Sequence, residues 1–124
     1  MQFLHVEDLC KFIEIVIQRQ PQNRIFNVGN NEVCDINKYV ELCYKAVGAP
    51  LEMVFVKGNF NQRDYFCFYD YEYILDITLQ NELMPDRIPL EEGIKREYVW
   101  YKNNENKINK KKYIEFIDEN FTEK

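Results

Sequence analysis

Arg63 and Asp64 are adjacent in a polar stretch with aromatic residues on both sides, and their types could support the recognition of a substrate. An arginine in such a place could hold a phosphate group through two hydrogen bonds. The aspartate could orient the arginine or accept a hydrogen bond from a sugar hydroxyl. The simpler alternative, which these two residues alone favour, is a surface ion pair of small energetic value.

Two further sets of residues have the composition of acid–base groups. His5 is the only histidine, and a histidine base needs an orienting partner. Glu7 and Asp8 are close by but have another role at a helix start, so a structural His5 is favoured. Tyr98 and Lys102 have the Y-x-x-x-K spacing with which short-chain dehydrogenases place a tyrosine and a lysine on one helix face. Tyr98 also falls on an apolar stripe and the chain contains no serine, which favours a core tyrosine.

The sequence lacks the patterns that bind cofactors and metals. Its four glycines are well separated and form neither a G-x-G-x-x-G turn nor a phosphate-binding loop. Its four cysteines form no C-x-x-C pair, and one histidine is too few for the usual zinc sites. We therefore expect no cofactor and no metal in this chain. Cys10 and Cys43 fall on apolar helical stripes, which predicts buried free thiols in a reducing cytoplasm.

Composition predicts a soluble globular protein. The 124 residues are 46% hydrophobic and 30% charged, with a net charge of −5. No apolar run approaches about 18 residues, so we expect no membrane span and no membrane partner. A net negative charge argues against binding to a nucleic-acid backbone, which requires a positive face.

Periodicity and turn signals predict alternating helices and strands. Asp35 is a candidate N-cap and Gly48 a candidate helix stop. The predicted helices span residues 8–18, 36–47, 78–83, 90–102 and 108–120, and the predicted strands span 24–28 and 51–57. This order predicts an α/β class, α+β-like in a fragment of this size, with helices packed on a small sheet.

Several segments, in order, resemble the C-terminal part of extended short-chain dehydrogenases/reductases, the NAD-dependent epimerase/dehydratase family. Phe3-Leu-His-Val-Glu-Asp-Leu-Cys10 resembles the family's F-I-H-V-D-D-L-A stretch, and Ile25-Phe-Asn-Val-Gly29 resembles its Y-N-V-G strand. The helix 35–47 occupies the place of its S-x-x-E-L helix. Asn61-Gln-Arg-Asp64 is similar to its arginine–aspartate loop. Met84-Pro85, Pro89-Leu-Glu-Glu-Gly-Ile94 and Val99-Trp-Tyr101 resemble its C-terminal motifs.

The resemblance implies the substrate-binding lobe of a Rossmann-type enzyme, with residues 1–104 as the family-like domain and 105–124 as a C-terminal helical extension. In that family the NAD(P) site and the catalytic residues precede the part resembled here, so this chain is not expected to be catalytically competent alone. Arg63 and Asp64 would bind a nucleotide-sugar-like small molecule. A family arginine would precede Phe3, where this chain has Gln2.

Two functions remain open at this point. One is the substrate-binding portion of a nucleotide-sugar epimerase/dehydratase-like protein, and the other is a non-catalytic binding or oligomerisation module. Strand 24–28 would have unpaired edges if the rest of the sheet were missing. We therefore expect a homo-oligomer, or association with a separately encoded N-terminal Rossmann part.

Overall fold

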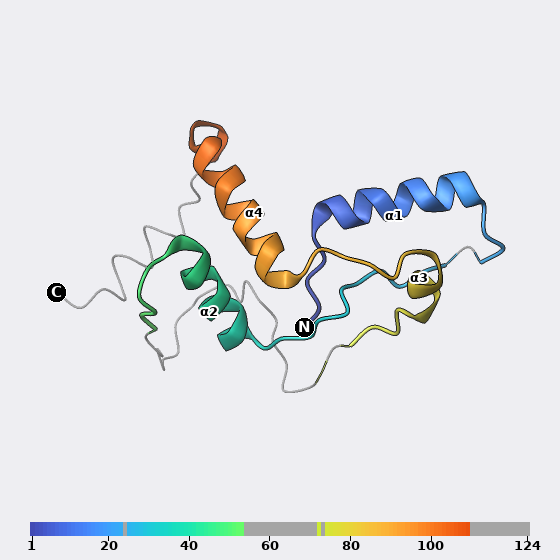
Figure 1. Cartoon of the computed structure of the whole chain (residues 1–124), viewed down its shortest axis with the longest axis horizontal. Helices are drawn as coiled ribbons and strands as arrows, with labels where there is room; N and C mark the ends of the chain where they lie inside the picture. Colours follow the sequence, from blue (N-terminus) through green and yellow to red (C-terminus); the bar gives the residue numbers. More distant parts are fainter. Residues whose placement is uncertain (24, 54–71, 73, 110–124) are drawn as a thin grey trace, which may run out of the picture.

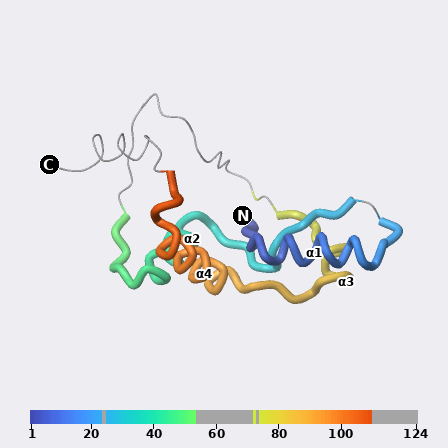
Figure 2. Tube along the Cα trace, turned by 90° about the horizontal axis from the view of Figure 1, so that it is seen from above, coloured from blue at the N-terminus to red at the C-terminus, as the bar shows by residue number. Residues whose placement is uncertain are grey.

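The computed structural model describes residues 1–23, 25–53, 72 and 74–109, and this part of the chain is helical (Figure 1). Helices α1 and α3 lie at one end of the molecule and α2 and α4 at the other, with extended segments between them (Figures 1 and 2). The elements are α1 (Val6–Arg19), α2 (Ile36–Val47), α3 (Thr78–Leu83), α4 (Leu90–Asn103) and the 3-10 turn η1 (Glu105–Lys107).

The helices begin and end close to where the sequence predicts. The Asp35 carboxylate accepts a hydrogen bond from the backbone N–H of Lys38 at 2.7 Å, as an N-cap should. Gly48 ends α2 with φ of 74°, a left-handed conformation that glycine adopts without a steric cost. Helix α1 begins two residues earlier than expected, because the His5 side chain caps it. The predicted helix 108–120 lies almost wholly outside the described residues.

The main core joins α2 to α4. Its buried members are Cys34, Leu42, Leu90 and Ile94. Phe3, from the N-terminal segment, stacks on Tyr39 with ring centroids 4.2 Å apart. Burial of these apolar groups is the main stabilisation of the pair, and it brings the N-terminal segment against both helices.

A second contact holds α1 to α3 at the other end of the molecule. Phe12 is buried on α1 and meets Phe26 edge to face at 5.4 Å between ring centroids. Ile77 and Met84, at the two ends of α3, are also buried. The opposite face of α1 has no such cover, and the expectation of a buried Cys10 is wrong because this residue lies on that exposed face.

The predicted α/β class is wrong, because no described residue belongs to a strand or a sheet. Residues 25–28 are extended coil, and Ile25 is 85% exposed. The predicted strand 51–57 is coil over 51–53, and the remainder lies outside the described residues. Alternating apolar residues favour an extended backbone, but a strand also requires a neighbour that shares its hydrogen bonds.

Side chains take the place of that neighbour. The Gln80 side chain is fully buried and accepts a hydrogen bond from the backbone N–H of Gly29 at 2.8 Å. The Asn27 amide donates to the carbonyl of Asp76 at 3.0 Å. Gln2 accepts from the Leu75 N–H at 2.6 Å and donates to the Asn30 carbonyl at 3.1 Å. The extended segments are therefore joined by polar side chains and not by a β-ladder.

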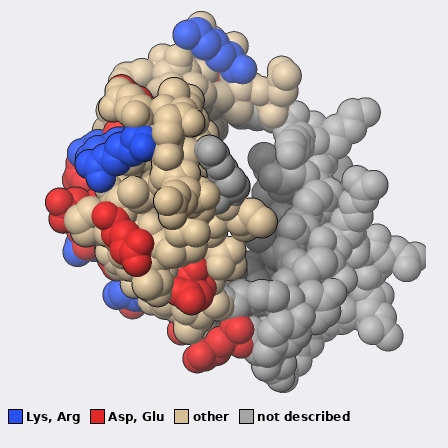
Figure 3. Space-filling model, turned by 90° about the vertical axis from the view of Figure 1, so that its right-hand side faces the viewer, with Lys and Arg blue, Asp and Glu red and all other residues tan. Residues whose placement is uncertain are grey.

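Charges are mixed on the described part of the surface. Basic and acidic side chains are interspersed on the face drawn in Figure 3, with uncharged residues between them. Among the described helices, none has the length and apolar character needed to cross a membrane. The expected lack of nucleic-acid and membrane partners stays a prediction.

The two ion pairs of Glu91, one to Lys45 of α2 and one within α4, predict an acid-sensitive contact between the helices. Lys95 and Lys45 both donate to the Glu91 carboxylate, and they lower its pKa from 4.5 to about 2. A lowered pKa means that the contribution to stability is complete above pH 4.5 and is lost as the pH falls towards 2. We expect NMR titration of the Glu91 carboxyl carbon to give a midpoint near 2. A midpoint at the ordinary value of 4.5 would show that the two lysines do not hold it in solution.

Candidate functional site

The two residues that the sequence predicts for substrate binding, Arg63 and Asp64, lie outside the described residues, as does the aromatic stretch around them. The structure therefore does not test their assignment to a phosphate and a sugar hydroxyl. It does show a cleft among the described residues, formed by the N-terminal segment and helices α2 and α4.

The cleft has a volume of about 590 Å³ and is mostly apolar. It is lined by the N-terminal segment, by residues just before α4, by α2 and by most of the length of α4. Its lining includes Phe3, Tyr39, Val47, Leu90, Ile94, Trp100 and Tyr101. Trp100 and Tyr101 expose about half of their surfaces, at 55% and 43%. Aromatic side chains with this much free surface suit the binding of a flat apolar group.

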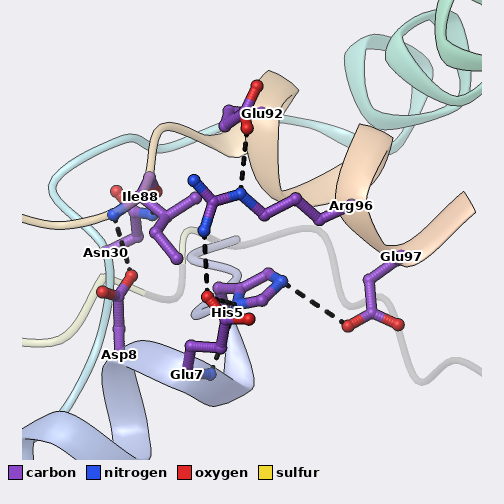
Figure 4. Close-up of polar contacts among 8 residues, drawn as sticks. All are labelled: His5, Glu7, Asp8, Asn30, Ile88, Glu92, Arg96 and Glu97. Atoms are coloured by element: carbon purple, nitrogen blue, oxygen red, sulfur yellow. Dashed lines mark hydrogen bonds and ion pairs between the residues drawn. The ribbon is translucent and has the colours of Figure 1, made fainter. Parts of the chain in front are cut away.

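His5 contributes a buried imidazole to the cleft (Figure 4). Its side chain is 8% exposed, and its Nδ1 accepts a hydrogen bond from the Glu7 backbone N–H at 3.2 Å. The imidazole also lies against Gly93, where an added Cβ would be 3.2 Å from His5 Cδ2. This close approach explains why α4 has a glycine at this point. The predicted structural role of His5 is confirmed in part, because it caps α1.

A chain of charged groups borders His5. The Arg96 guanidinium donates to Glu92 and to Glu7, both at 2.9 Å, and so connects α4 to the start of α1 (Figure 4). These two carboxylates raise the pKa of Arg96, with Glu92 the larger cause. Glu97, one residue further along α4, points towards the imidazole, with its Oε1 3.6 Å from His5 Nε2.

Tyr39 and Cys43 face the cleft from α2 and remain neutral. Burial raises the pKa of the Tyr39 hydroxyl, and a hydrogen bond with Cys43 adds to the effect. Burial also raises the pKa of the Cys43 thiol, partly opposed by Tyr39. A thiol with a raised pKa is a weak nucleophile at neutral pH. These residues therefore contribute polarizable surface and not a reactive group.

The structure gives no support to an acid–base pair of Tyr98 and Lys102. Tyr98 lines the cleft. Lys102 donates to Glu105 at 2.5 Å, and this hydrogen bond is the largest cause of its raised pKa. The lysine is thus held by a carboxylate one turn ahead, consistent with the interpretation that the Y-x-x-x-K match has no catalytic meaning.

Residues in or directly beside three of the resembling segments meet at the peptide groups of Ile88. Asp8 is buried, with 4% of the residue exposed, and its carboxylate accepts a hydrogen bond from the Ile88 N–H at 2.9 Å. The Asn30 amide donates to the Ile88 carbonyl at 3.1 Å (Figure 4). Asp8 belongs to the segment 3–10, Asn30 follows 25–29, and Ile88 precedes 89–94. Sequence reasoning placed Asp8 only at the helix start and missed this junction, because its members are 58 and 80 residues apart.

Comparison of the chain with protein-family models, with curated proteins and with solved structures finds no match. Within the described residues, no group of three or more His, Cys, Asp or Glu side chains could hold a metal ion. The described residues therefore form a mostly apolar cleft whose polar lining includes the His5 imidazole and the neutral Tyr39 and Cys43 side chains.

Proposed function

We propose that this chain is the substrate-binding C-terminal portion of an NAD(P)-dependent nucleotide-sugar epimerase/dehydratase-like protein. A separately encoded part would hold the NAD(P) and the catalytic residues. The observation that carries the proposal is the junction at Ile88, where hydrogen bonds join Asp8, which lies in one segment that resembles the family, to residues directly beside two others. Resembling segments that come in order and also approach one another in space support a common unit more strongly than the same segments scattered over the fold.

Three of the described cations are already paired with carboxylates. Arg96 is bonded to Glu92 and Glu7, and Lys45 and Lys95 share Glu91. A phosphate would have to displace a carboxylate from each of these side chains. Arg63, with an adjacent aspartate to orient it, remains the candidate that the resemblance implies.

Arg63→Ala is expected to weaken the binding of UDP-glucose by about tenfold or more, because a charge-assisted hydrogen-bond pair to a phosphate is lost. Isothermal titration calorimetry on the full chain measures this change. Arg19→Ala is the matched control, since Arg19 is an exposed arginine that makes a weak hydrogen bond, at 3.5 Å, to the Leu83 carbonyl. Equal affinities for Arg63→Ala and the unaltered chain would remove Arg63 from the site. Saturable binding of NAD by this chain would contradict the proposal that a separate part holds the cofactor.

An oligomerisation module is the second candidate, and the exposed face of α1 favours it. Val6, Leu9, Ile13 and Ile17 recur every three or four residues and are 39% to 64% exposed. Together they form a continuous apolar stripe along the helix, which we call the α1 stripe. A stripe of this length is unusual on the free surface of a monomer.

The spacing of the α1 stripe fits a second copy of the same helix. In an antiparallel pair with its two-fold axis near residues 11–12, Val6 of each copy faces Ile17 of the other, and Leu9 lies near Ile13. Lys11 lies on the opposite side of the helix from the stripe, so its charge is not part of this contact. The apolar stripe can therefore pair with itself, as a symmetric dimer requires.

A further inference from the structure

The cleft contains an unpartnered hydrogen-bond donor. Because Nδ1 of His5 accepts the Glu7 N–H, the proton of the neutral imidazole lies on Nε2. That nitrogen is buried and has no hydrogen-bond partner among the described residues. Glu97 Oε1, at 3.6 Å, is too far away to accept. A buried donor without an acceptor is unfavourable, so the position calls for an atom that is not part of the described chain.

The separation of His5 and Glu97 limits the chemistry of that atom. Nε2 is closed to solvent in this arrangement, so an oxygen can come within hydrogen-bond distance of both groups only when the Glu97 side chain, which is 61% exposed, rotates away from the imidazole. The oxygen must accept from Nε2–H and can donate to the Glu97 carboxylate. A hydroxyl group does both. A carboxylate or a phosphate could accept from His5 but would be repelled by Glu97.

The rest of the cleft lining indicates what kind of molecule carries the hydroxyl. Tyr39 and Cys43 are neutral, and most of the lining is aliphatic or aromatic. Trp100 and Tyr101 supply exposed ring surface from α4. We propose that this cleft is a binding site for a phenol-type ligand, with the hydroxyl between His5 and Glu97 and the aromatic ring against the apolar lining. This site goes beyond the proposed function, since it uses neither Arg63 nor a phosphate.

The chain itself supplies two specific reporters for a test. It contains one histidine and one tryptophan, His5 and Trp100, so their NMR signals need no discrimination from others. On titration with 2-naphthol, the His5 ring protons and the Trp100 indole N–H are expected to shift together and to saturate. Naphthalene lacks the hydroxyl and 2-naphthoate replaces it by an anion, and both are expected to bind at least about tenfold more weakly.

Two variants separate the hydroxyl site from a general apolar surface. Glu97→Ala removes an exposed side chain and is expected to reduce the preference for 2-naphthol over naphthalene by about fivefold to tenfold without unfolding the chain. His5→Phe keeps a ring of similar size and should abolish the preference. Circular dichroism establishes that each variant is folded. The proposal is overturned if 2-naphthol produces no saturable shift, or if folded Glu97→Ala binds 2-naphthol and naphthalene with the same ratio as the unaltered chain.

Discussion

Ile13→Asp is expected to convert the proposed dimer to a monomer at every accessible concentration, because it puts a carboxylate into the apolar contact between two α1 stripes. Ile13 is already 49% exposed, so the folded monomer should tolerate the change. Analytical ultracentrifugation measures the oligomeric state.

Lys11→Asp is the matched control, since it puts the same carboxylate on the same helix but on the side away from the stripe, and it should dimerise as the unaltered chain does. If Ile13→Asp dimerises as well as the unaltered chain, α1 does not pair with a second copy. The stripe would then be a surface for a different protein, as the first proposed function requires.

Asp8→Ala is expected to lower the free energy of unfolding by about 2–3 kcal/mol, a large change for a polar residue. Asp8 is buried, and its carboxylate is the acceptor for the Ile88 N–H at 2.9 Å. Alanine would leave that N–H without a partner. It would also remove the negative charge that partly opposes the effect of burial on the guanidinium of Arg87, whose pKa is lowered. Urea denaturation followed by circular dichroism measures the loss.

Two variants on the same helix serve as controls. Asp8→Asn keeps the volume and a carbonyl oxygen that can accept from Ile88, so it should cost less than half as much as alanine. Glu14→Ala alters an exposed carboxylate and should stay within about 0.5 kcal/mol of the unaltered chain when compared as monomers. A loss for Asp8→Ala no greater than that of Glu14→Ala would mean that the Ile88 hydrogen bond contributes little in solution.

The sequence was sufficient to predict the helices because their signals are local. Asp35 and Gly48 delimit α2 at the predicted positions, and Thr78–Leu83 is found where expected. It was insufficient for the fold class, because a strand depends on a neighbour. Residues 25–28 have the alternation of a strand. The hydrogen bonds of this segment and of Gly29 beside it are instead made through the side chains of Asn27 and Gln80.

In the candidate site too, local features could be predicted from the sequence and long-range contacts could not. His5 was recognised as the only imidazole, yet nothing local indicates that Glu97 would lie beside it. The two are 92 positions apart and no periodicity connects them. The one usable signal was Gly93, an interior helix glycine, which is costly unless another group must come close. Arg63 and Asp64, selected from their residue types and from the family resemblance, remain predictions.

The hydrogen bonds at Ile88 also have a consequence for synthesis. While the chain is made, α1 leaves the ribosome with Asp8 exposed to water, and its acceptor atoms have no protein partner until Ile88 emerges 80 residues later. The Gly29 N–H likewise lacks its acceptor until Gln80 emerges 51 residues later. The N-terminal third of the nascent polypeptide therefore cannot complete these native contacts until Gln80 and Ile88 have emerged. During that interval the α1 stripe is exposed to chaperones and to neighbouring nascent chains on the same messenger RNA.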